Sequence, residues 1–357
     1  MIRSSGMSRA ALSQATIRSQ LLRLQRLRHV PHAVRTTRLV VLALCVPFVA
    51  LIALSIGSVQ LPLSDVWTAL THPSATGVTH TIVWDLRLPR VLMAMGVGAG
   101  LGIAGTLLQA LFRNPLVDPY ITGVSAGAAL AAAAGFTLGV AFAFIPALAF
   151  GGGLACAALV AAIGTGESPS GNLRLVLAGV AVSAFASALV TLILLRGNGG
   201  NLGILAWLAG GINGRGWSDL GLMAMYLSVG CAAALAQVHA VNLLRLGSAA
   251  AQGFGLRLDV ARWRILATAS LITAACVAVS GVVGFVGLMV PHVVRKLVSG
   301  DARWLLAGSA LGGAIVVVIA DLLARTVMAP AEVPLGVLLA FVGVPFFLLL
   351  ARRPVEL

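Results

Sequence analysis

The chain has 357 residues, of which 59% are hydrophobic and 10% charged, and its mean hydropathy of +1.03 excludes a water-soluble globular protein. Its formal net charge is +14, and residues 1–38 contribute eight arginines and no acid. Because aromatic residues do not alternate with these arginines, nucleic-acid binding is a poor interpretation. We expect a cytoplasmic tail that sets orientation and touches anionic lipid.

Uncharged blocks of sequence predict the membrane-spanning helices, because about 20 apolar residues cross a bilayer. Two blocks are too long for one helix, and glycine and proline divide them between Gly135 and Pro146 and between Gly281 and Gly284. The blocks are 39–64, 91–112, 119–166, 175–195, 220–244, 265–294, 304–320 and 333–351. The sequence therefore predicts an all-α polytopic membrane protein with about ten spans, in three parts: a basic N-terminal tail (1–38), a transmembrane domain (39–351) and a C-terminal tail (352–357).

The distribution of basic residues predicts the orientation, since loops rich in Lys and Arg remain in the cytoplasm. With ten spans and a cytoplasmic N-terminus, 19 of the 24 basic residues lie inside, and both termini are cytoplasmic. The five on the opposite side, which need a separate reason, are Arg87, Arg90, Arg196, Arg215 and Arg325.

The second span is rich in glycine, and its overlapping GxxxG spacings allow helix backbones to approach closely. Tight packing within one subunit is the favoured interpretation, and a helix that slides or lines a path is the alternative. The glycines are Gly96, Gly98, Gly100, Gly102 and Gly105.

Four cysteines lie inside apolar blocks without CxxC spacing, so the sequence predicts packing residues and neither disulfides nor a metal site. They are Cys45, Cys156, Cys231 and Cys276.

Residues that could perform chemistry are few, which argues against an enzyme. His292 has no second histidine or carboxylate at metal-ligand spacing, so a structural role is favoured. Asp321 lies four residues before Arg325, and an ion pair within the helix is favoured over a proton-coupling carboxylate. No Walker A motif occurs, and Lys296 is the only lysine, so ATP would have to bind another polypeptide.

Six ordered motifs resemble the membrane-spanning permease subunits of type II ABC importers, which take up vitamin B12, ferric siderophores and haem. The resemblance covers residues 39–353. The motifs are RLPR (87–90), QALFRNPLVDP (109–119), GVSAGA (123–128), LAGVAVSA (177–184), GFVGLMVPHVVRKL (284–297), and ADLLAR (320–325) paired with AEVPLGV (331–337).

The resemblance implies an assembly in the bacterial cytoplasmic (inner) membrane. Its expected parts are two copies of this chain, two ATPase subunits that hold ATP and Mg, and a soluble substrate-binding protein outside; no cofactor is expected in this chain. It further implies that Arg87, Arg90 and Arg325 meet acidic residues of the binding protein, in agreement with the charge count. For Arg196 and Arg215, lipid contact or a local ion pair is expected.

The resemblance also implies where the ATPase and the gate lie. The segment 243–258 corresponds to coupling helices that rest on the ATPase, and the expected contacts are Leu246, Gly247, Ser248, Ala251, Gln252, Phe254, Gly255 and Leu256. Ser248 and Phe254 depart from the acid and the leucine that are frequent in the family. The implied gate residues are Asn114, Leu116, Asn172 and Leu173, and for Asn114 a helix-capping role is equally compatible.

The cargo is less defined, because a low-affinity path lined by small apolar residues carries few specific polar contacts. An iron chelate, haem or a ferric siderophore, is favoured, and vitamin B12 is the alternative. An ion-coupled secondary transporter is a weaker alternative, because the single buried acid, Asp321, lies close to the outer surface.

Overall fold

A computed structural model describes residues 32–57, 59–72, 77–164, 171–196, 202–298 and 301–351, although the side chains of 171, 172, 350 and 351 are not included. Most of the predicted N-terminal tail and the whole predicted C-terminal tail therefore lie outside the described residues. In the described ranges all regular secondary structure is helical, with no strand. The predicted all-α class is confirmed.

Ten helices match the ten predicted spans. They are α2 (His32–Ser55), α5 (Leu88–Phe112), α6 (Val124–Thr137), α7 (Ile145–Gly164), α8 (Gly171–Arg196), α10 (Trp217–Ala236), α13 (Leu258–Ser280), α14 (Val286–Val298), α15 (Ala302–Thr326) and α16 (Leu335–Ala351). Seven helical stretches in the described part of the chain are long and apolar enough to cross a membrane by themselves. The helices α6, α14 and α16 are shorter, which fits a bundle whose helices differ in length.

Both long blocks divide where glycine and proline predicted: α6 ends at Thr137 before α7 begins at Ile145, and α13 ends at Ser280 before α14 begins at Val286. Two helix boundaries differ from the boundaries of the uncharged blocks. Helix α2 already begins at His32, inside the predicted tail, and α10 ends at Ala236, so the rest of block 220–244 forms a separate helix.

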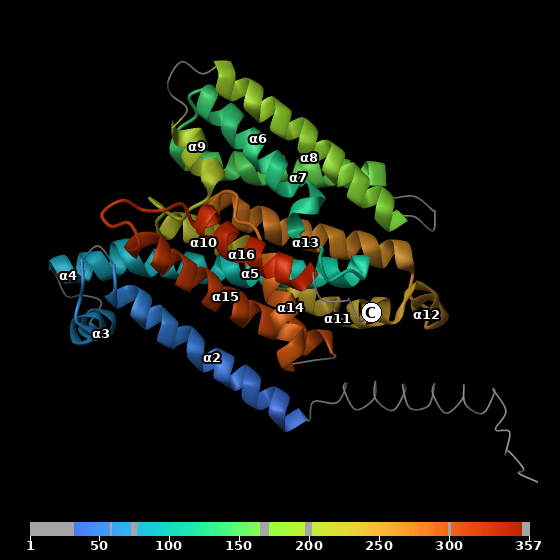
Figure 1. Ribbon diagram of the computed structural model, residues 1–357, viewed down its shortest axis with the longest axis horizontal. Helices are drawn as coiled ribbons and strands as arrows, with labels where there is room; N and C mark the ends of the chain where they lie inside the picture. The colour runs from blue at the N-terminus through green and yellow to red at the C-terminus, as the bar shows by residue number, and fades with distance from the viewer. Residues whose placement is uncertain are drawn as a thin grey trace, which may run out of the picture.

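Short helices connect the spans, and most of them carry no apolar block that predicts them. They are α3 (Leu63–Thr71), α4 (Val78–Thr81), the π-helical segment η1 (Ile82–Arg87), the 3₁₀ segments η2 (Pro119–Thr122) and η3 (Phe142–Phe144), α9 (Leu202–Ala209), α11 (Val238–Leu246) and α12 (Ser248–Gly253). Figure 1 places α3 and α4 at one end of the bundle and α12 at the other. We call these the α3 end and the α12 end.

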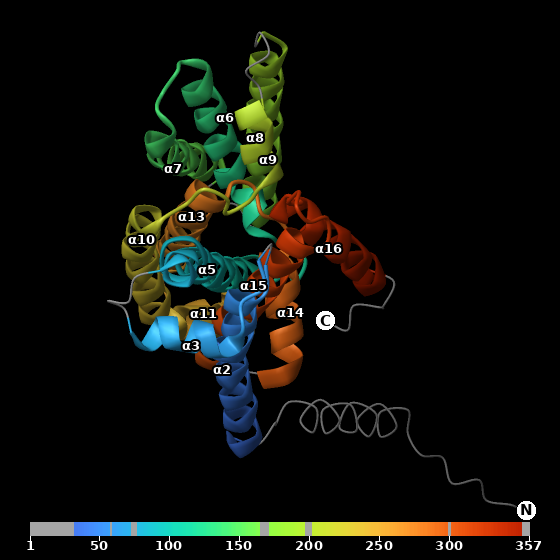
Figure 2. The ribbon, with the colours of Figure 1, turned by 90° about the vertical axis from the view of Figure 1, so that its left-hand side faces the viewer.

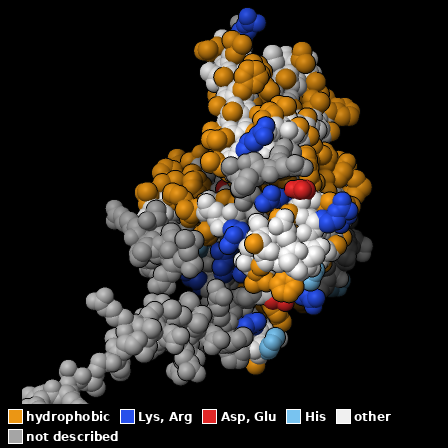
Figure 3. All heavy atoms as spheres, turned by 90° about the vertical axis from the view of Figure 1, so that its right-hand side faces the viewer, with side chains coloured by type: hydrophobic (Ala, Val, Ile, Leu, Met, Phe, Trp, Pro, Cys, Tyr) orange, Lys and Arg blue, Asp and Glu red, His pale blue; other side chains and the backbone are white. Residues whose placement is uncertain are grey.

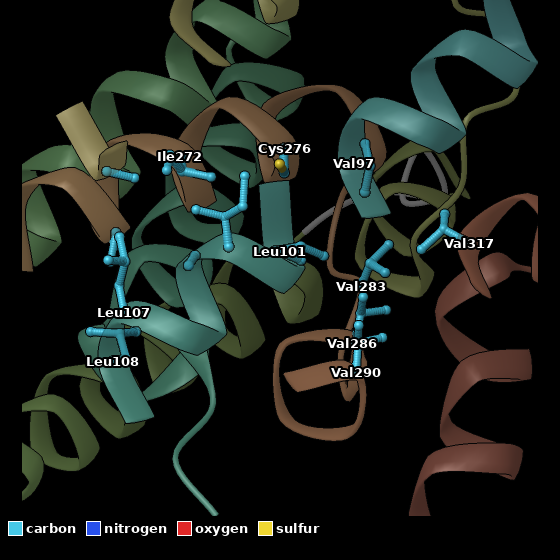
Figure 4. Packing of buried hydrophobic residues seen from close by; sticks show 14 of the residues in the cluster. Val97, Leu101, Leu107, Leu108, Ile272, Cys276, Val283, Val286, Val290 and Val317 are labelled. Carbon is cyan, nitrogen blue, oxygen red and sulfur yellow. The ribbon is translucent and has the colours of Figure 1, made fainter. Parts of the chain in front are cut away.

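Helix α5 is the centre of the fold, with α10, α13, α14 and α15 around it, while α6, α7, α8 and α9 form a separate layer to one side (Figure 1, Figure 2). The apolar side chains of α5 contact those of α13, α14 and α15 in one large core (Figure 4). The labelled members of that core are Val97, Leu101, Leu107, Leu108, Ile272, Cys276, Val283, Val286, Val290 and Val317.

The glycines of α5 allow neighbouring helices to touch it backbone to backbone. A Cβ added at Gly98 would lie 2.1 Å from the carbonyl oxygen of Gly313 in α15, and one added at Gly105 would lie 1.9 Å from that of Gly287 in α14. No side chain fits in either place. Tight packing within one subunit is therefore confirmed for this helix.

Candidate functional site

Arg87 is buried at the α3 end, where it binds the carboxyl end of α2. Its side chain is 6% exposed. Nη1 donates to the carbonyl oxygens of Leu54 and Ser55, at 2.6 and 3.0 Å, and Nη2 donates to that of Val59. Leu54 and Ser55 are the last two residues of α2, where carbonyl oxygens have no later helical N–H to accept from, and Val59 follows in the next loop. Arg87 therefore stabilises a helix end inside the chain.

Arg90, one turn further along, binds two carboxylates at once. Nε donates to both oxygens of Asp321, at 3.0 and 3.1 Å, and Nη2 lies 2.9 Å from the nearer oxygen. Nη1 and Nη2 donate to the two oxygens of Glu332, at 3.1 and 3.0 Å. All the edges of the guanidinium are thus used within the chain.

Arg325 completes this group, which we call the arginine cluster: Arg87, Arg90, Arg325, Asp321 and Glu332. Arg325 Nε lies 3.2 Å from an oxygen of Asp321, which confirms the predicted ion pair, and Nη2 donates to the carbonyl oxygen of Ala53. Three guanidinium groups face two carboxylates, so the cluster keeps one surplus positive charge. Asp321 is bound to two arginines, so it is not free to carry a coupling ion.

The structure thus brings the three predicted docking arginines together but turns them inward. The side chains of Arg87 and Arg325 are 6% exposed, and that of Arg90 is 13% exposed. Within the cluster, the most accessible side chain is Glu332, which is 33% exposed. Charge counting could not find the role of Glu332, although it stands inside the motif AEVPLGV.

Arg215 forms the expected local ion pair. Its Nη1 lies 3.6 Å from Asp219, Nε donates to the carbonyl oxygen of Val279, and the guanidinium stacks over the ring of Phe142 at 4.5 Å. Arg196 is exposed at the end of α8.

A second polar group joins the Asn-Pro break to the start of α14, and the sequence analysis did not find it. Gln109 is 3% exposed and donates from Nε2 to the carbonyl oxygens of Gly287 and Leu288, at 3.2 and 3.3 Å. Its Oε1 accepts from Nη2 of Arg295 at 2.9 Å. A glutamine inside an apolar block was the signal, because such an amide needs buried partners.

Asp118 lies in the same junction and accepts from the backbone N–H of Tyr120 at 3.0 Å. Burial raises the pKa of Asp118 to about 6, opposed by the N–H groups of Tyr120 and Leu288. The carboxylate lines a cavity of about 470 Å³ with Phe285 and Gly336. This cavity lies between η2, the turn before α14 and the start of α16.

The predicted gate residues at the break form a turn. Arg113 ends α5 in the left-handed conformation, with φ of 52°, and Oδ1 of Asn114 accepts from the N–H of Leu116 at 2.9 Å. Asn114 therefore stabilises the junction through a turn, whereas the capping role considered from the sequence would have placed it at a helix start. Leu173 is 62% exposed on α8, and the side chain of Asn172 lies outside the described residues.

The segment expected to couple to an ATPase forms the tip of the α12 end. Leu246 and Phe254 are 63% and 70% exposed, whereas Ala251 between them is buried. Gly247 and Gly255 bracket α12 with positive φ of 115° and 80°, where glycine is favoured. Ser248 and Leu256 are partly buried and Gln252 is exposed. Lys and Arg side chains gather around this face (Figure 3).

His292 packs against α16, with its ring 6.1 Å from that of Phe346 in an edge-on arrangement. Cys276 is fully buried in the core, as the packing interpretation predicts. In the described part of the chain, no group of His, Cys, Asp and Glu is arranged to hold a metal ion.

Comparison with known proteins identifies the family of the chain. Residues 44–353 match the model of the FecCD transport family. The chain belongs to the FecCD transport family. A hemin transport system permease of Yersinia pestis is 38% identical over 319 residues, covering 86% of this chain and 94% of that protein. An iron(3+)-hydroxamate import permease of Bacillus subtilis is 37% identical (85% and 80% covered), and a cobalamin import permease of Halobacterium salinarum is 40% identical (80% and 79%).

This FecCD chain also shares its fold with a solved structure described as an inward-facing conformation of a metal-chelate type ABC transporter. The TM-score is 0.78 at 30% identity, covering 88% of this chain and 99% of the other. The chain is therefore a membrane-embedded permease of the type II ABC importer class, a family whose members work with ATPase and binding-protein partners.

Proposed function

We propose that this permease passes an iron chelate, haem or a ferric siderophore, from a substrate-binding protein into the cytoplasm. The observation that carries the proposal is the contrast between the two ends of the bundle. The α3 end holds a surplus positive charge in the arginine cluster, and the α12 end projects Leu246 and Phe254 from a short helix. Hemin and iron(3+)-hydroxamate permeases among the relatives favour an iron chelate as cargo.

The assembly that we propose contains two copies of this chain, two ATPase subunits and one binding protein in a bacterial cytoplasmic membrane, with both termini inside. Leu173, Leu177 and Phe185 expose apolar surface along α8, by 62%, 59% and 67%. Such a face requires lipid or a second helix. A second copy would place the α8 residues and the Asn114 turn around a central gate.

For the binding protein, we propose the arginine cluster as the receiving site, with Arg90 as the contact and Arg87 and Arg325 as positioning residues. The surplus positive charge would attract an acidic side chain of the partner, and the guanidinium of Arg90 would bind that carboxylate in a forked geometry. Arg87 and Arg325 are bound to carbonyls of α2, so their first effect is to hold the cluster in place.

For the ATPase, we propose that α12 and the residues around it rest on the partner, which holds ATP and Mg. Exposed Leu246 and Phe254 supply apolar contact, and buried Ala251 anchors α12 to the bundle. Rigid contact there would transmit closure of the ATPase pair to the membrane helices.

The test is uptake by proteoliposomes that contain the permease together with an ATPase subunit and a binding protein from the same organism. We expect ATP-dependent uptake of hemin or of a ferric hydroxamate only when both partners are present, and no ATP hydrolysis by the permease alone. Uptake without the partners would refute the assignment and favour a secondary transporter.

Cobalamin is the second candidate, because a cobalamin permease is 40% identical to this chain. The same vesicles decide between the cargoes, with the binding protein offered hemin, ferric hydroxamate and cobalamin in turn. Uptake of cobalamin alone would replace the iron chelate as cargo and leave the importer assignment intact.

A further inference from the structure

The two carboxylates on Arg90 differ in how firmly they are held. Asp321 is 2% exposed as a side chain, lies within α15 and also pairs with Arg325. Glu332 is 33% exposed, lies in the connection between α15 and α16, and in the described part of the chain forms ion pairs with Arg90 alone. Asp321 is therefore the more firmly held counter-ion of Arg90, and Glu332 is the more accessible one.

Glu332 lies three residues before the start of α16. Its neighbour Val333 donates its N–H to the carbonyl oxygen of Ala324 at 2.9 Å, and α16 begins at Leu335. The first turns of α16, at Gly336 and Val337, form part of the wall of the 470 Å³ cavity. Glu332, which pairs with Arg90 near the surface, is thus only four residues before Gly336 in the cavity wall.

We propose that Glu332 is a resident carboxylate that an acidic side chain of the binding protein replaces on Arg90. This inference rests on the proposed docking at the arginine cluster. The replacement exchanges one carboxylate for another on the same guanidinium edge, so the buried charge of Arg90 remains paired throughout. Release of Glu332 then frees the connection before α16, and docking loosens the wall of the cavity.

The geometry defines the chemistry of the partner. The fork on Arg90 is formed by Nη1 and Nη2 with two oxygens, at 3.1 and 3.0 Å. An aspartate or glutamate reproduces both bonds, whereas an amide offers one acceptor oxygen and no charge. The site therefore selects an acidic residue on the face of the binding protein.

The experiment compares Glu332→Gln with Asp85→Asn in full-length permease, reconstituted in nanodiscs with its ATPase. Asp85 is an exposed acid just before the RLPR motif, so its variant removes the same charge without touching Arg90. Affinity for the binding protein is measured by biolayer interferometry over a range of salt concentrations. We expect Glu332→Gln to bind about tenfold more tightly, with a steeper salt dependence, and Asp85→Asn to bind like wild type.

Equal affinity of Glu332→Gln and wild type would overturn the exchange and leave docking at the cluster intact. A third variant, Arg90→Gln, separates the two proposals. If it binds the binding protein like wild type, the docking proposal fails and the exchange fails with it. Hydrogen exchange at residues 333–340 gives a second measurement: we expect faster exchange in free Glu332→Gln than in free wild type, and unchanged exchange would overturn the link to α16.

Discussion

The centre and the rim of this bundle use apolar residues for different purposes. The most hydrophobic windows of α5 and α13 are both 78% buried inside the chain, whereas those of α2, α8 and α10 are 11%, 28% and 17% buried. The central helices have small residues at their contacts, so the backbones of other helices can pack directly against them. The rim helices present large side chains outward. In a membrane, an exposed apolar side chain can pack against lipid or against another subunit. Hydropathy alone therefore does not distinguish central helices from rim helices.

The strongest test of this difference is a side chain at the centre. We expect Gly105→Leu to prevent folding, at a cost above about 5 kcal/mol, because its Cβ would lie 1.9 Å from the carbonyl oxygen of Gly287. The matched control is Gly221→Ala on rim helix α10, where no atom lies within 4 Å. The control gains up to about 1 kcal/mol from helix propensity. Thermal unfolding in detergent measures both, and equal Tm values would contradict the distinction.

A smaller loss of stability is expected at the α3 end, where ion pairs rather than apolar contacts hold the helices together. Asp321→Asn leaves the buried Arg90 and Arg325 without their shared counter-ion, and we expect a destabilisation of about 3–5 kcal/mol. The exposed Asp85→Asn is the control and should leave Tm unchanged. A stable Asp321→Asn variant would mean that the cluster contributes little to the fold.

A gain in stability is expected when the buried carboxylate of Asp118, beside the cavity, is replaced. Burial raises the pKa of Asp118 to about 6, above its unfolded value near 4, so the folded state binds the proton more tightly. Stability from this group is present below pH 4 and is lost as the pH rises to 6. Asp118→Asn keeps an acceptor for the N–H of Tyr120, and we expect it to be more stable than wild type at pH 7.5, by at most about 3 kcal/mol.

The check is a pair of unfolding curves for Asp118→Asn and wild type, at pH 4 and pH 7.5. The two proteins should coincide at pH 4 and separate at pH 7.5. A difference that is the same at both pH values would show that the carboxylate is not the cause.

The smallest effect on stability is expected at the rim. Phe254→Ser removes a side chain that is 70% exposed at the α12 end, so Tm should change by less than the equivalent of about 0.5 kcal/mol. Stimulation of the partner ATPase should fall severalfold, since the contact surface is lost. Undiminished stimulation would remove Phe254 from the proposed contact.

Spans and their divisions were predictable from this sequence because charge and glycine mark them directly. The direction of the arginine side chains was not predictable. An arginine on the outer side of the membrane can turn back into the bundle and bind carbonyl oxygens, and the sequence does not show which carbonyls are within reach. Arg87 is the example, because its guanidinium donates to carbonyl oxygens at the end of α2. Gln109 and Glu332 were missed for a related reason, since their partners lie 178 and 242 positions away along the chain.

The backbone contact between Gly98 and Gly313 has a mechanical consequence. Two main chains packed this closely cannot slide past each other without separating. Helices α5 and α15 therefore act as one rigid body through the bundle. Asn242 in α11, the helix before α12, hydrogen-bonds Asp301 and Ala302 at the start of α15, and Arg90 and Asp321 bind each other near the opposite ends of the two helices. If an ATPase binds at α12 and a binding protein at the arginine cluster, as we propose, a force applied at the α12 end would move the α3 end as part of one rigid body.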